Sequence, residues 1–153
     1  MAVRSCRHYV VPTFSPPRVR LAFIREAHVA KLDHLIVKVN DHAQSVRFYS
    51  DVLGFAFEGT DGPFSVMRVD ADCVLLLSRW GTPGGEHYAF SVSRTEFDAI
   101  FARIRAAGIG YGPTFDTVGS NREPGEENGA RGVAPTLYFN DPNQHLLEIR
   151  TYD

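Results

Sequence analysis

A pattern of one strand, one helix and three strands occurs twice along this chain, and this repeat restricts the fold more than any other feature. In the first copy, alternating apolar and polar residues over 32–39 predict a strand. A helix over about 43–53 is expected to follow and to end at Gly54. In the second copy, residues 86–92 alternate in the same way, and Ser93 has the pattern of a capping box at the start of a helix.

Turn residues divide the remainder of each copy into three short strands. The expected strands lie near 55–58, 64–70, 73–79, 109–111, 135–140 and 144–151. The two copies are in register, since 53 residues separate His34 from His87. A repeat of this length indicates two copies of one structural unit. We therefore predict an α+β fold in which two βαβββ modules, about residues 31–80 and 86–152, form a curved mixed sheet.

Composition limits the classes of protein that this chain can belong to. Its 153 residues, 44% of them hydrophobic, are enough for one domain with a core. The net charge of −2 argues against a nucleic-acid partner, and no apolar run is long enough to predict a membrane span. Cys6 and Cys73 are far apart and form no disulfide framework, so a reducing, cytoplasmic location is expected.

Two segments lie outside the repeat. Residues 1–30 contain scattered arginines and prolines without the pattern of a signal peptide, and we expect an N-terminal extension ahead of the domain at 31–153. Residues 113–133 form a long insertion in the second copy, rich in Gly, Glu, Asn and Arg. A solvated, charged loop is the favoured interpretation. The alternative is a lid over a site, formed by Glu126, Glu127 and Arg131.

Glu148 is the most unusual residue of the last expected strand. Leu147 and Ile149 point to one face of that strand, so Glu148 points to the other, as does Arg150. A carboxylate in the middle of a strand is costly unless it has a partner. His34 and His87, each near the start of the first strand of its copy, are candidates.

These three side chains would converge if the two modules formed one curved sheet. Two imidazoles and one carboxylate on one side of a divalent ion make a facial triad, which leaves coordination positions open for substrate, water or dioxygen. The alternative is that the alternation only reflects a half-solvated antiparallel sheet, and that each histidine is solvated. The matched places of His34 and His87 in the repeat favour the metal site.

The chain resembles the vicinal oxygen chelate superfamily, which includes glyoxalase I, fosfomycin-resistance enzymes, methylmalonyl-CoA epimerase, extradiol dioxygenases and bleomycin-resistance proteins. The resemblance covers about residues 31–152. It rests on Leu32-Asp33-His34-Leu35, on Phe48-Tyr49 with Leu53-Gly54-Phe55, and on Leu137-Tyr138-Phe139-Asn140-Asp141-Pro142 with His145-Leu146-Leu147-Glu148. It implies paired βαβββ modules and one divalent ion per site (Fe²⁺, Mn²⁺, Ni²⁺ or Zn²⁺). The metal ligands that it implies are His34, His87 and Glu148.

The same resemblance separates branches of the superfamily. Glyoxalase I has a fourth ligand, a glutamate in the last strand of its first module, whereas here residues 73–78 contain no carboxylate. The chain is therefore more similar to the three-ligand fosfomycin-resistance and dioxygenase branches. In those branches a tyrosine ten residues before the ligating glutamate faces the substrate, and Tyr138 occupies that place. The alternative for Tyr138 is a strand aromatic that packs on its neighbour.

Three further residues are candidates for substrate binding. Thr136 is expected on the same strand face as Tyr138. Lys38 and Arg150 are expected on the ligand-bearing faces of their strands and would supply positive charge to an anionic substrate. His145 is excluded as a ligand, because its offset of three from Glu148 places it on the opposite face.

The favoured function is a metal-dependent enzyme that chelates a small oxygen-bearing substrate, of the dioxygenase type or of the fosfomycin-resistance and lyase type. The main alternative is a metal-free protein of the bleomycin-resistance type that sequesters a ligand. A third possibility is a protein with an occupied but inert metal site. By analogy with two-module members, we expect a homodimer whose metal sites lie between modules of different chains, a small-molecule substrate, and neither nucleic acid nor membrane as a partner.

Overall fold

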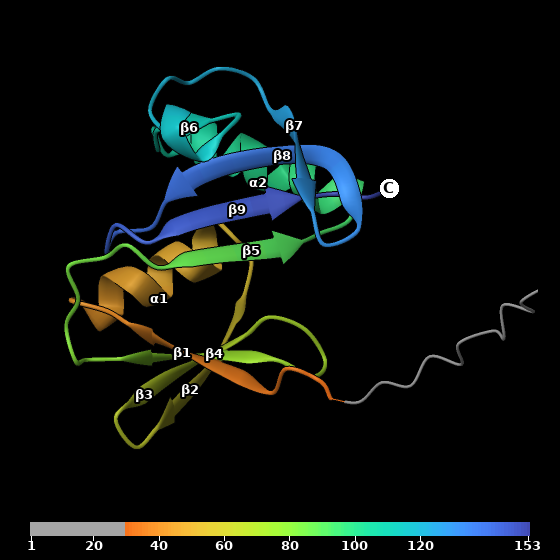
Figure 1. Ribbon diagram of the computed structural model, residues 1–153. Coiled ribbons are helices and arrows are strands. Elements are labelled where there is room, and N and C mark those ends of the chain that lie inside the picture. The colour runs from red at the N-terminus through yellow and green to blue at the C-terminus, as the bar shows by residue number, and fades with distance from the viewer. Residues whose placement is uncertain (1–29) are drawn as a thin grey trace, which may run out of the picture. The chain divides into compact units, whose positions relative to one another are not determined.

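The computed structural model describes residues 30–153, and residues 31–153 form one compact unit (Figure 1). The expected N-terminal extension lies outside the described residues apart from Ala30, and so does Cys6. The first module consists of β1 (His34–Lys38), α1 (His42–Asp51), β2 (Ala56–Asp61), β3 (Phe64–Arg68) and β4 (Val74–Ser78). The second consists of β5 (His87–Ser91), α2 (Arg94–Ala106), β6 (Tyr111–Gly112), the 3₁₀ turn η1 (Phe115–Thr117), β7 (Gly125–Gly129), β8 (Gly132–Asn140) and β9 (Leu146–Arg150).

Local sequence signals explain where both helices begin and end. The side chain of Asp41 accepts a hydrogen bond from the backbone N–H of Gln44 at the start of α1. At the start of α2, the side chain of Ser93 accepts a hydrogen bond from the backbone N–H of Glu96. Beyond each helix a glycine has positive φ, +80° at Gly54 and +66° at Gly108. This backbone conformation suits glycine, so the expected end of the first helix at Gly54 is confirmed, and Gly108 ends the second helix in the same way.

The α+β fold and the two βαβββ modules are confirmed. The strands of the described residues form two sheets, however, and not one continuous sheet. The first has the order β1-β4-β3-β2, and the second has the order β5-β9-β8-β6 with β7 added on β8. Both sheets are mixed, because β1 is parallel to β4 and β5 is parallel to β9 while the other pairs are antiparallel. The two strands that carry the candidate histidines, β1 and β5, are therefore edge strands.

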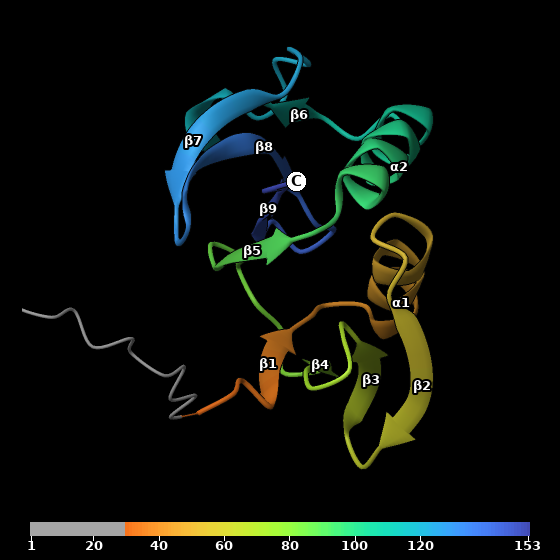
Figure 2. The ribbon, with the colours of Figure 1, turned by 90° about the vertical axis from the view of Figure 1, so that its right-hand side faces the viewer.

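One apolar core joins the two modules. It contains side chains from both helices and from both sheets, among them Val37, Tyr49, Leu77, Phe97, Ile104, Phe139 and Ile149. The helices lie next to each other (Figure 2), and Arg103 Nε of α2 donates a hydrogen bond 2.8 Å long to the carbonyl of Val52 at the end of α1. Each sheet thus has one face on this core and a second, helix-free face on its other side.

The turn between β8 and β9 also connects the modules. Asp141 is buried and accepts hydrogen bonds from the hydroxyl of Tyr49 (3.0 Å) and from the backbone of Asn143 and His145. The ring of His145 is fully buried and its Nε2 lies 2.9 Å from the carbonyl oxygen of Lys38. The aspartate and histidine of this turn therefore serve packing between modules.

The insertion at 113–133 contains more structure than its composition predicts. It holds η1 and the strand β7, which forms a hairpin with β8 and pairs from Gly125 opposite Thr136 to Gly129 opposite Gly132. The sequence Gly-Glu-Glu-Asn-Gly has low intrinsic β propensity, so the hydrogen bonds to β8 are what make it a strand. The expectation of a solvated loop was wrong for this part of the insertion.

Neither α1 nor α2, the two α-helices among residues 30–153, is long and apolar enough to cross a bilayer.

Candidate metal centre

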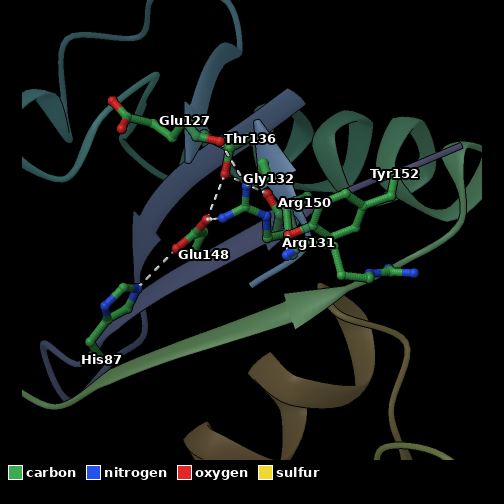
Figure 3. A network of polar contacts seen from close by, with 9 residues as sticks. His87, Glu127, Arg131, Gly132, Thr136, Glu148, Arg150 and Tyr152 are labelled. Atoms are coloured by element: carbon green, nitrogen blue, oxygen red, sulfur yellow. Dashed lines mark hydrogen bonds and ion pairs between the residues drawn. The ribbon is translucent and has the colours of Figure 1, made fainter. Parts of the chain in front are cut away.

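Two of the three expected metal ligands lie together on the helix-free face of the second sheet. In the parallel pairing of β5 with β9, His87 is opposite Leu146 and Ala89 is opposite Glu148. His87 and Glu148 are therefore diagonal neighbours, and their side chains point toward each other (Figure 3). His87 Nε2 lies 3.3 Å from Glu148 Oε2.

This separation fits two ligands of one divalent ion. Nitrogen and oxygen ligands lie about 2.1 Å from such an ion, so two ligands at right angles are about 3 Å apart. The observed 3.3 Å between Nε2 and Oε2 is close to that value. An imidazole and a carboxylate are also the donor types of the facial triad. The pair thus has the chemistry and the spacing to hold a metal ion.

Glu148 is almost fully buried, with 3% of its surface exposed, and its two oxygens have different environments. Oε1 accepts a hydrogen bond from Thr136 Oγ1 at 2.8 Å and another from Arg150 Nη1 at 3.0 Å. Oε2 faces His87. The fold therefore supplies a counter-ion and a hydroxyl to one oxygen of the carboxylate and leaves the other directed at the candidate site.

Arg150 has most of its hydrogen-bonding capacity already in use. It is buried, and its Nη2 donates to the carbonyl oxygens of Glu127 in β7 (2.7 Å) and Gly132 in β8 (3.3 Å). The guanidinium also lies 5.1 Å from the ring of Tyr152. Thr136 is fully buried too. The structure thus places both residues against Glu148, and their roles in substrate binding stay predictions.

Tyr138 lies next to the pair. It is directly opposite Glu148 in the antiparallel pairing of β8 with β9, and its ring centroid is 6.0 Å from that of His87. Burial, followed by the negative charge of Glu148, raises the pKa of Tyr138 to about 12. The hydroxyl therefore stays protonated at neutral pH and can donate a hydrogen bond to an oxygen in the site.

His34 is not part of this cluster. It belongs to β1 of the other sheet, its side chain is 46% exposed, and its Nδ1 lies 2.7 Å from Asp33 Oδ2. Within residues 30–153, no group of three or more His, Cys, Asp or Glu side chains is arranged to hold a metal ion. Lys38, at the other end of β1, is also exposed. A single chain therefore brings together His87 and Glu148 but leaves His34 apart.

Sequence reasoning did not identify the groups that hold Glu148. The search for its partner considered histidines and a metal ion, whereas the structure adds Arg150, two residues away on the same face of the strand. The i, i+2 spacing of opposite charges was the signal that could have found it. No sequence pattern indicated that the carbonyls of Glu127 and Gly132 contact Arg150, because the hairpin that carries them was expected to be a loop.

Comparison with known proteins agrees with this architecture. Residues 31–149 match the family model described as the Glyoxalase/Bleomycin resistance protein/Dioxygenase superfamily. The virulence protein STM3117 of Salmonella typhimurium is 28% identical over 134 residues, which are 81% of this chain and 85% of that protein. The glutathione transferase FosA of Serratia marcescens is 28% identical over 126 residues, or 77% of this chain and 78% of that protein.

Among solved structures, the oxidase ChaP-H2 is similar with a TM-score of 0.68 and 36% identity, over 81% of this chain and 94% of that one. The family model covers both modules, including the strands that carry His34, His87 and Glu148. The repeat, the fold and these matches agree, and the chain belongs to the glyoxalase/bleomycin resistance protein/dioxygenase superfamily, the vicinal oxygen chelate proteins.

Proposed function

We propose that this protein is a metal-dependent enzyme of the oxidase or dioxygenase type that binds a small oxygen-bearing substrate by chelation. Its divalent ion is held by His87 and Glu148 of one chain and by His34 of a second copy. The observation that carries the proposal is the 3.3 Å approach of Nε2 of the half-exposed His87 to Oε2 of the buried Glu148. Iron(II) or manganese(II) suits these ligands and oxygen chemistry.

The position of His34 supports a site shared between two chains. His34 and His87 lie on edge strands of different sheets, so each edge is free to approach another chain. Large apolar residues flank His34, with Leu32 57% and Ile36 41% exposed. Apolar residues exposed together mark surfaces for association. A homodimer that covers this surface would bring the third ligand to each His87–Glu148 pair.

Two observations favour an oxidase over a fosfomycin-resistance enzyme. Identity to the oxidase ChaP-H2 is 36%, whereas identity to the glutathione transferase FosA is 28%. A phosphonate substrate would also need cationic groups in the site. The guanidinium of Arg150, on the same face as Glu148, already binds a carboxylate oxygen and two carbonyls.

Each residue of the site has a distinct task in this proposal. His87 and Glu148 hold the ion, which when bound supplies Lewis-acid chemistry to the chelated substrate oxygens. Tyr138, whose hydroxyl is protonated at neutral pH, donates a hydrogen bond to a substrate oxygen on which negative charge develops. The buried network around Thr136 and Arg150 keeps water from Glu148 Oε1.

Metal content is the first test. The untagged protein is purified, reconstituted with each divalent ion in turn, and its metal measured by mass spectrometry beside His34→Ala, His87→Ala and Glu148→Gln. One ion per chain, lost in all three variants, is the expected result. Oxygen uptake is then followed with catechols and related vicinal diols. If the wild-type chain binds no metal under any of these conditions, the enzyme assignment fails, and binding of apolar ligands by a metal-free protein is tested instead.

A mixed dimer tests whether two chains share the site. His34→Ala and Glu148→Gln are co-expressed with different affinity tags, and the heterodimer is isolated. A shared site leaves one of the two sites with all its ligands, so metal binding returns to half of the chains. Sites formed within one chain would leave the heterodimer as deficient in metal as either variant alone.

A further inference from the structure

We infer that Arg150 is a positioning residue, which the β7–β8 hairpin holds in place and which fixes Glu148 so that only Oε2 is available to the metal. The inference rests on the proposed function, because it concerns how Glu148 coordinates the ion. It adds a task for Arg150 and for the hairpin that covers it.

The hydrogen bonds of Glu148 indicate coordination through one oxygen. A carboxylate oxygen has two lone pairs for hydrogen bonds. Oε1 uses both, one for Thr136 Oγ1 at 2.8 Å and one for Arg150 Nη1 at 3.0 Å. Binding a metal through both oxygens would require giving up at least one of these bonds. Coordination through Oε2 alone leaves one more position on the ion for substrate or dioxygen.

The hairpin determines where the guanidinium lies. Nη2 of Arg150 donates to the carbonyls of Glu127 and Gly132, on the two strands of the hairpin. Nε is buried and has no hydrogen-bond partner among residues 30–153, so the hydrogen bonds that orient the group there come from Nη1 and Nη2. The opposite side of the guanidinium packs directly on Gly129, where a Cβ atom would collide with its Nη1 and Cζ atoms.

A second arginine attaches the tip of the hairpin to the rest of the domain. Arg131, at the tip, donates from Nη2 to the hydroxyl of Ser91 at 2.6 Å. Its guanidinium also lies 4.0 Å from the ring of Tyr152, which Figure 3 shows beside Arg150. The tip of the insertion is thus fastened to the end of β5 and to the C-terminal segment. Through Arg150, the conformation of this hairpin is connected to the orientation of a metal ligand.

Gly129→Ala tests this connection without changing a ligand or a charge. Gly129 does not have positive φ, so alanine suits its backbone, and the new methyl group forces the guanidinium away from Glu148. Asn128→Ala is the matched control, because Asn128 is the adjacent, exposed residue of the same strand. Arg150→Met removes the guanidinium directly. The dissociation constant of Mn²⁺ is measured for each protein by competition with a chromogenic chelator, and thermal unfolding is followed without metal.

We expect Gly129→Ala and Arg150→Met to weaken Mn²⁺ binding about tenfold or more, as loss of a group that orients a ligand does in other metal sites. Asn128→Ala should bind like the wild type. If Gly129→Ala also binds like the wild type, or if it lowers only the unfolding temperature, Arg150 has a structural role and the inference is overturned. A wild-type chain that binds no Mn²⁺ or other divalent ion would overturn the proposed function as well. The two failures are therefore distinct.

Discussion

The two modules have the same order of strands and helix, but their helix-free faces differ. The two histidines are equally exposed, His34 at 46% and His87 at 47%. In the first module this face is open, with Ile36 41% exposed. In the second, Thr136 is fully buried and Glu148 is 3% exposed. The difference comes from the β7–β8 hairpin, which has no counterpart in the first module and lies against Arg150.

The strand register shows which residues of the two modules correspond. Leu76 pairs with Ile36 across β1 and β4, in the place where Glu148 pairs with Ala89 across β5 and β9. The first module therefore has an apolar residue where the second has its carboxylate ligand. The first module thus supplies one exposed histidine, whereas the second supplies an equally exposed histidine beside a buried carboxylate. The residue type at this position, Leu76 or Glu148, and not the topology of the repeat, separates these roles.

Glu148→Gln should have the largest effect on stability and would test the contrast most directly. It leaves the buried guanidinium of Arg150 without a counter-ion, which costs about 3 kcal/mol or more. Urea unfolding in the presence of a chelator measures the loss. The double variant Glu148→Leu with Arg150→Met removes both charges and should recover much of it. Equal stability of Glu148→Gln and the wild type would contradict this explanation, because it would show that the buried guanidinium does not depend on the Glu148 carboxylate.

Tyr49→Phe examines whether the modules are coupled. It removes the buried hydrogen bond from α1 to Asp141 in the β8–β9 turn, and bonds of this kind to a charged group contribute about 1.5–3 kcal/mol. The loss should appear in urea unfolding, and hydrogen exchange should increase in β8 and β9 although the substitution lies in the first module. Tyr88→Phe is the control and should cost less, because Tyr88 is partly buried and packs against the shared core. An effect confined to the first module would mean that the modules unfold separately.

Alkaline pH should affect the same contact. Burial, and then the charge of Asp141, raises the pKa of Tyr49 above the usual value near 10. Above that value, tyrosine in the unfolded chain loses its proton while Tyr49 in the folded chain keeps it. The stabilisation is therefore complete below about pH 10 and is lost as pH rises further. Unfolding free energies from pH 8 to 11 should fall less steeply for Tyr49→Phe than for the wild type, and coincident slopes would contradict this explanation.

His34→Ala should have the smallest effect on the folded chain. An exposed side chain contributes little to stability, so metal-free His34→Ala should unfold within about 0.5 kcal/mol of the wild type. Its metal content should nevertheless fall as far as that of His87→Ala. A large loss of stability without metal would indicate that the open face of the first module is packed against another chain even in the absence of the ion.

Much of the fold follows from local sequence. The alternation over 32–39, the capping serine at Ser93 and the glycine at Gly54 correctly predicted one strand and two helix ends, because each signal acts over a few residues. Strand β7 could not be predicted in this way. Its residues favour a loop, and only hydrogen bonds to a strand farther along the chain make it extended.

The candidate site also has a part that local sequence predicts and a part that it does not. The alternation in the last strand correctly placed Glu148 and Arg150 on one face, and the repeat placed His87 on a neighbouring strand. Periodicity does not report burial on that face, so it did not indicate that the guanidinium of Arg150 contacts Glu148. That arrangement depends on the hairpin folding back across the strand.

The repeat, the helix ends and the strand faces could be read from the amino-acid sequence, because period and capping are properties of neighbouring residues. Long-range contacts explain why the strands of the described residues form two sheets, why β1 and β5 are edges, and why His34 lies apart from His87 and Glu148. They also explain why Oε1 of Glu148 is occupied by Thr136 and Arg150 while Oε2 faces His87. These features depend on contacts between residues far apart in the chain. The free energy of such contacts comes from burial and from pairing of polar groups, and a pattern of neighbouring residues does not report either one.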